Sequence, residues 1–141
     1  MAVEQGLYQL VTSDAGIKAA VGVDANGTTR AYWILAPQGA AVPFLIFSRI
    51  STGDSYAMSG ATGLRDGLFQ IVCYSTTFYG SRVVANSVRT FLQNYKGTLP
   101  DSDATVVDGV LVEKDFDDRY ESGQKSFIYG AFLQFRIFYL D

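Results

Sequence analysis

The C-terminal stretch SFIYGAFLQFRIFYL (Ser126–Leu140) decides the fold. Every odd-numbered position from 127 to 139 is apolar, whereas the even-numbered positions include Gln134 and Arg136. Because successive side chains of a strand point to opposite faces of a sheet, this alternation predicts a long strand with one face on the core and a mixed opposite face. The pattern is typical of an antiparallel sheet that is covered on one side.

Four further apolar segments predict strands that pair with it. They span residues 29–35, 44–50, 68–75 and 105–112. The Gly- and Ser-rich stretch 51–67 joins two of these strands, and we expect it to be the extended tip of a hairpin. A turn is possible at Asp108-Gly109, and the polar, acidic segment 113–123 predicts a solvated loop.

Apolar residues recur at helical spacing in two regions. Residues 2–22 predict an N-terminal helix with a break, where Ser13 is placed to cap a short second segment that Gly22 ends. The second region predicts a central amphipathic helix that ends at Gly97. Its apolar face carries Val84, Val88, Phe91, Leu92 and Tyr95. The order α-β-β-β-α-β-β predicts an α+β domain, a mostly antiparallel sheet with the N-terminal and central helices packed on one face.

Length and composition limit the classes of protein. At 141 residues the chain is about one domain long, so residues 1–141 are predicted to form a single domain. The net charge of −3 and the dispersed basic residues argue against binding nucleic acid by bulk attraction. There is no apolar run of about 20 residues and no targeting segment, so we expect no membrane span and synthesis in a reducing cytoplasm. Cys73, the single cysteine, lies in an apolar run and is expected to be a buried thiol.

The search for reacting groups begins with an absence, because the chain contains no histidine. The commonest general base and the commonest metal ligand are therefore missing. One carboxylate cluster could support glycoside hydrolysis or hold calcium or magnesium. Its members are Glu113, Asp115, Asp117, Asp118 and Glu121. The spacing is not that of a calcium-binding loop, and Lys114 and Arg119 lie among the acids as ready partners. We therefore predict no catalytic residue, no metal and no cofactor, with a small carboxylate hydrolase or a cation-binding module as the alternative from another class.

Several landmarks follow one another along nearly the whole chain. They are a helix with a Ser-Asp break, Pro-Gln-Gly leading into an apolar strand at 36–44, an arginine-containing strand ending in an aromatic at 65–74, Val-Arg-Thr-Phe-Leu at 88–92, Val-Asp-Gly-Val at 107–110, Asp-Arg-Tyr-Glu at 118–121 and the terminal aromatic strand. In this order they resemble the phage tail-completion family, whose members are similar to tail terminators.

The resemblance implies a structural virion protein without catalytic residues. It implies a homo-oligomer, a hexameric ring at the head-proximal end of the tail tube, assembled in the host cytoplasm. Such a ring stops growth of the tube, contacts the tail tube protein and presents a surface to the head-completion (connector) proteins. DNA would only pass through its lumen. A tail-to-head joining protein of the connector, and a monomeric binding domain, remain as rival hypotheses.

We predict that two segments outside the core carry the assembly contacts, the hairpin tip and the acidic segment. Both are long and polar to mixed in composition, which is typical of contact surfaces rather than of a core. Their predicted interface residues are Tyr56, Met58, Leu64, Arg65, Asp115, Asp117, Asp118 and Arg119.

Overall fold

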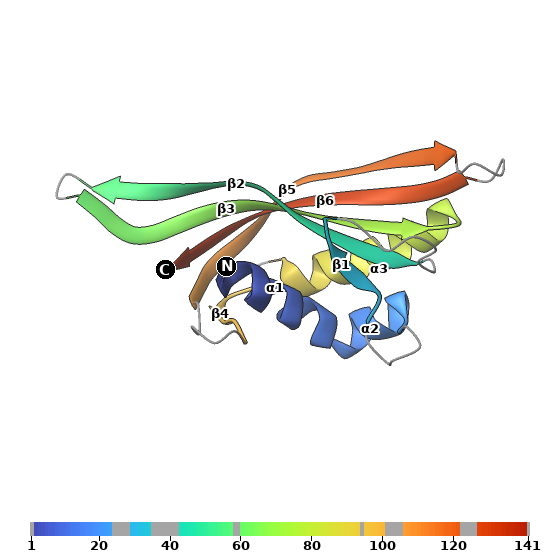
Figure 1. Cartoon of the computed structure of the whole chain (residues 1–141), viewed down its shortest axis with the longest axis horizontal. Coiled ribbons are helices and arrows are strands. Elements are labelled where there is room, and N and C mark those ends of the chain that lie inside the picture. Colours follow the sequence, from blue (N-terminus) through green and yellow to red (C-terminus); the bar gives the residue numbers. More distant parts are fainter. Residues whose placement is uncertain are drawn as a thin grey trace.

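The computed structural model describes residues 2–23, 29–34, 43–57, 60–93, 95–100, 106–121 and 127–140. In these residues a six-stranded sheet, in the order β1-β2-β3-β6-β5-β4, carries three helices on one side (Figure 1). The elements are α1 (Ala2–Ser13), α2 (Ala15–Val21), β1 (Ala31–Trp33), β2 (Phe44–Ala57), β3 (Gly60–Ser75), α3 (Phe78–Leu92), β4 (Gly97–Thr98), β5 (Val106–Glu121) and β6 (Phe127–Leu140). Only β1 pairs in parallel, with β2. The predicted α+β class, the mostly antiparallel sheet and the helices on one face are confirmed.

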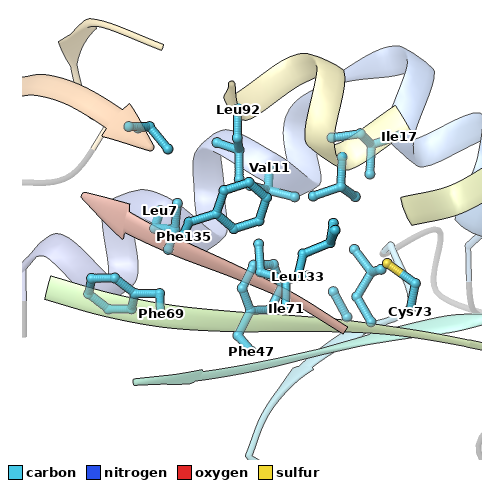
Figure 2. Packing of buried hydrophobic residues seen from close by; sticks show 14 of the residues in the cluster. Leu7, Val11, Ile17, Phe47, Phe69, Ile71, Cys73, Leu92, Leu133 and Phe135 are labelled. Carbon is cyan, nitrogen blue, oxygen red and sulfur yellow. The ribbon is translucent and has the colours of Figure 1, made fainter. Parts of the chain in front are cut away.

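Strand β6 lies between β3 and β5 and supplies the largest share of the sheet's core face. Its odd-numbered residues from Ala131 to Tyr139 are at most 3% exposed, which confirms the alternation read from the sequence. Figure 2 shows Leu133 and Phe135 gathered with Leu7, Val11 and Leu92, which come from the helices. Full burial of one such side chain stabilises the fold by about 1.5–3 kcal/mol.

The helix boundaries differ in part from the prediction. The cap of α2 is Asp14, not Ser13, because the Asp14 carboxylate accepts the Ile17 N–H at 3.0 Å while the Ser13 hydroxyl donates to the Gln9 carbonyl. Gly22 has a φ of 92° after the last turn of α2, in agreement with the expected glycine stop. Among the described residues, no helix combines the length and the apolar character needed to cross a membrane.

The central helix α3 ends earlier than predicted. Its cap is Thr77, whose hydroxyl accepts the Gly80 N–H at 3.0 Å. The helix ends at Leu92, so Tyr95 and Gly97 lie outside it. The chain leaves helical geometry at Gln93, and this allows Gly97 and Thr98 to pair with β5.

Two segments that we predicted as a connection and as a loop are strands. Most of residues 51–67 belongs to β2 and β3, and residues 113–121 belong to β5. Asp108-Gly109 is not a turn, because the strand continues there through a β-bulge. Both segments form strands despite their Gly-rich or acidic composition, because each pairs with a neighbouring strand and strand preference depends strongly on such context.

The fold predicts a large difference between two phenylalanines on opposite faces of the sheet. Phe135 is 0% exposed under the helices, whereas Phe116 is 42% exposed on the other face. Phe135→Ala should lower the free energy of unfolding by about 4 kcal/mol, because it leaves a cavity in the core. Phe116→Ala should cost about 1 kcal/mol, the value of its ring contact. Urea denaturation of both variants measures the difference, and equal losses would contradict the one-sided core.

Candidate functional site

The four predicted interface residues of the hairpin lie on or beside paired strands. Tyr56 of β2 pairs with Ala61, and Leu64 of β3 pairs with Leu140, the last residue of β6. Arg65 lies with its guanidinium carbon 6.0 Å from the centre of the Tyr139 ring, so it packs within its own chain. Met58 and the side chains of Tyr56 and Leu64 are outside the described part of the molecule.

The outer end of this hairpin has no neighbouring strand. Because β6 ends opposite Leu64, the backbone at 55–57 and 60–63 pairs only within the hairpin, among the described residues. We call these residues the hairpin arm. Figure 1 shows the arm projecting beyond the helices, at one end of the sheet.

The acidic residues of β5 divide into two kinds. The Asp115 carboxylate accepts hydrogen bonds from Arg82 at 2.8 Å and from Arg89 at 2.6 Å, both from α3. Asp117 forms an ion pair with the Arg82 Nε at 2.9 Å. We call these four residues the arginine–aspartate cluster. Asp115 pairs with these arginines of α3 rather than with its neighbour Lys114, because the Asp115 side chain points to the helix side of the sheet and the Lys114 side chain to the other face.

The cluster keeps Asp115 ionised. Partial burial alone would raise the pKa of its carboxyl, but hydrogen bonds from Arg82 and Arg89 and their positive charges outweigh burial and lower that pKa below its ordinary value. The same contacts raise the pKa of the Arg82 guanidinium against the opposing effect of burial. Asp115 is therefore an anion that positions β5 against α3.

Asp118 and Arg119 belong to the second kind and lie exposed at the far end of β5. The Asp118 carboxylate accepts the backbone N–H of Arg119 at 2.8 Å. In the described ranges, no group of three or more acidic, cysteine or histidine side chains is placed to hold a metal ion.

A row of aromatic residues crosses the face of the sheet that the helices leave open. Neighbouring ring centres lie 6.1, 5.3, 6.4 and 4.9 Å apart along the row. In order from β1 to β5, its members are Tyr32, Phe44, Tyr74, Phe132 and Phe116. The first four rings are half-buried and the Phe116 ring is exposed. The residues beside them in the strands, such as Leu45 and Leu133, are fully buried on the other face. This aromatic row places partly exposed rings on the open face, and aromatic side chains are enriched at protein contacts.

A groove of about 820 Å³ separates α1 from β1 and β2. Glu4 and Arg49 pair across its wall at 2.6 Å. Ile34, at its rim, has a φ of 67° and is 77% exposed. A β-branched residue rarely adopts this left-handed conformation, so the backbone is strained where it presents an apolar side chain to the surface.

Cys73 carries no reactive thiol. It is fully buried in β3, as predicted, and this burial raises the pKa of the thiol far above its ordinary value, with a small opposing effect of Arg82. A neutral thiol without access to solvent is not a nucleophile.

The sequence held signals for two features that the prediction missed. Arg82 and Arg89 are seven residues apart, two helical turns, so they lie on one side of α3. Phe132 occupies an even-numbered position of β6, on the face opposite the core residues. A search for charged residues at helical spacing, and for aromatic residues on the predicted outer face, would have found both.

The arginine–aspartate cluster predicts a pH-dependent contribution to stability. Asp115→Asn should lower the free energy of unfolding by about 2 kcal/mol at pH 7, because two hydrogen bonds to a charged group are weakened. The native pKa of Asp115 lies below its ordinary value of 3.8, so this stabilisation is complete above that pH and disappears as the pH falls through the native pKa. Urea denaturation at pH 7 and below pH 3 measures the loss. Asp118→Asn is the matched control and should change little at either pH, and a pH-independent effect of Asp115→Asn would contradict the ion pairing.

Comparison with known proteins identifies a family and a similar solved structure. The family of Tail completion protein gp17 matches residues 5–140. A chain from the virion of a native gene transfer agent particle has a similar structure, with a TM-score of 0.65 over 99% of this chain and 92% of that chain. The two share 18% sequence identity, so the similarity concerns the fold. No curated protein matches the chain.

The family match covers almost all of the described sheet and helices, from α1 to the end of β6. The main features of the described molecule are the hairpin arm, the aromatic row and the charged strand β5, and its cysteine is buried. These features are consistent with a structural family. The chain therefore belongs to the Tail completion protein gp17 family, whose members are structural rather than enzymatic parts of the tails of phage-like virions.

Proposed function

We propose that the chain is the ring-forming subunit that closes the head-proximal end of the tail tube. In this proposal a hexameric ring contacts the tail tube protein on one side and the head-completion (connector) proteins on the other. It ends tube growth and allows the tail to join the head. DNA passes through its lumen, and the net charge of −3 does not favour binding to the phosphates.

The hairpin arm is the observation that carries the proposal. A two-stranded hairpin is at best marginally stable by itself in water. In the described residues, β6 ends opposite Leu64, so residues 60–63 of the arm form no backbone pairing with β6. A projecting arm of this kind is best explained as an element that is stabilised by a neighbouring subunit.

The geometry of a terminator explains why more than one surface is needed. A tube grows because each subunit repeats the same head-to-tail contact, which has no built-in end. A terminator must match the tube on one face, refuse another tube ring on the other, and bind its own copies side by side. The chain has distinct surfaces available for these contacts: the arm, the aromatic row and the far end of β5.

The predicted interface residues differ in how they would contribute to these contacts. We propose Tyr56, Met58 and Leu64 as contact residues of the arm, together with Asp118 and Arg119 at the exposed end of β5. Arg65, Asp115 and Asp117 already make contacts within the chain. Arg65 and Asp115 would support an interface mainly by positioning the strands that carry it, whereas Asp117 remains partly exposed.

Shortening the arm tests the proposal. Replacing residues 54–64 with a short turn should leave a folded protein, because the core lies under the other parts of the sheet. The shortened protein should fail to restore joined, DNA-containing particles in a phage that lacks its own copy. Particle counts by electron microscopy and a thermal unfolding curve measure the two effects.

The control is Lys96→Ala, which changes an exposed side chain away from the arm. It should leave assembly unchanged. Normal joining by the shortened protein would contradict the proposal. Binding of the purified chain to connectors but not to tube ends would instead assign it to the joining side of the junction.

A further inference from the structure

Among the residues that the structure describes, the sheet has two long edges that are mostly uncovered. β1 pairs with β2 only at Leu45–Phe47, and β4 pairs with β5 only at Val106 and Val107. In the described residues, no strand lies outside β2 from 48 to 57, or outside β5 from 109 to 121. An uncovered edge presents unpaired N–H and C=O groups that can bind another strand.

The direction of these groups follows from two backbone hydrogen bonds. The Leu45 N–H donates to the Arg30 carbonyl at 2.9 Å, and the Phe47 carbonyl accepts the Ile34 N–H at 2.8 Å. Residues 45, 47 and 49 of β2 therefore turn their backbone groups away from β3. In each strand, successive residues turn their backbone N–H and C=O groups alternately to one neighbouring strand and to the other. Following this alternation from β2 through the registers of β3 and β6 gives outward-facing backbone groups at Asp115, Asp117 and Arg119 of β5.

Arg119 supports this assignment independently. Its N–H donates to the Asp118 carboxylate instead of to β6. This is expected of an outward-facing group at a strand edge.

Strand direction favours one pairing between copies of the chain. The four long strands, in the order β2-β3-β6-β5, are all antiparallel to their neighbours. Since their number is even, β2 and β5 run in opposite directions. A rotation about an axis along the strands keeps every copy in the same orientation, so β5 of one copy meets β2 of the next in antiparallel fashion, the more stable arrangement.

We infer that β5 of one subunit pairs with β2 of the next, so that the sheet continues from copy to copy around the ring. This inference rests on the proposed ring function and specifies its side-to-side contact. The contact is heterologous and leaves one β2 edge and one β5 edge free until the ring closes.

Charge complementarity supports the same pairing. The uncovered stretches, 48–57 and 109–121, overlap fully in more than one register, and in one of these registers Arg49 of one copy comes opposite Asp117 of the next. Both residues turn their backbone groups outward, and both side chains lie on the helix side, next to Glu4 and Arg82 respectively. The side chain of Arg49 is 49% exposed and that of Asp117 is 35% exposed, so both can take a further partner.

Thiol cross-linking in assembled tails tests the contact. Ser51 and Lys114 are exposed and lie on the open face near the middle of the two stretches. With Ser51→Cys and Lys114→Cys in one chain, a short bifunctional thiol reagent should give a ladder of covalent oligomers on denaturing gels. The native Cys73 is fully buried and does not react in the folded protein.

Two controls make the result specific. Each single variant should give no covalent dimer, because a heterologous contact keeps identical positions of two copies apart. The matched control, Ser51→Cys with Lys18→Cys on the exposed side of α2, should give no ladder.

The outcomes separate this contact from the proposed function. Tails that are capped by rings but give no ladder would overturn the edge pairing and leave the ring in place. Covalent dimers from a single variant would overturn it in favour of a two-fold contact. Tails that carry no ring of the unmodified chain would overturn the proposed function, and the edge pairing with it.

Discussion

The central position of β6 is the constraint on which the rest of the structure depends. It is paired with β3 from Tyr129 to Leu140 and with β5 from Phe127 to Leu140, both antiparallel. The period of two therefore assigns each of its side chains to one face without ambiguity, since a shift of one residue would reverse every assignment. With Leu133 and Phe135 committed to the helices, Phe132 and Gln134 must face away. The open face is thus a direct consequence of the core.

The arginine–aspartate cluster adds a second constraint at the edge of the sheet. Far along β5 the ladder to β6 is the only pairing in the described residues, and α3 reaches this strand through Arg82 and Arg89. Partly buried ion pairs gain little net stability, because desolvation of the charges opposes their attraction. Their effect here is mainly on position, since they hold the outer strand against the helix layer. The far end of β5 is consequently presented in a defined orientation.

The sequence predicts the parts of this fold that depend on local pattern. The alternation of β6, the buried thiol of Cys73 and the amphipathic face of α3 follow from spacing alone. The errors occur where pairing decides the structure. The acidic run of β5 has a loop-like composition, but Asp115 and Asp117 alternate with Phe116 and are balanced by arginines that lie 33 and 26 residues away from Asp115. No local rule contains these long-range partners.

The same distinction applies to the candidate surfaces. The prediction that the hairpin and the acidic segment lie outside the core depends on composition. The shape of these segments depends on how far β2 and β3 extend beyond β6, and only the strand register gives that length.

The distribution of polar groups explains why such a chain acts by contact rather than by chemistry. It has no histidine, and its thiol is buried with a raised pKa. Asp115 is held by two arginines, while Asp66 and Glu113 share Arg136. A general acid or base needs a group that can exchange protons near neutral pH, and each of these carboxylates is instead paired with a permanent cation. In the described residues, what remains open is aromatic surface and the backbone hydrogen-bonding groups at strand edges, and both are features that another protein chain can bind.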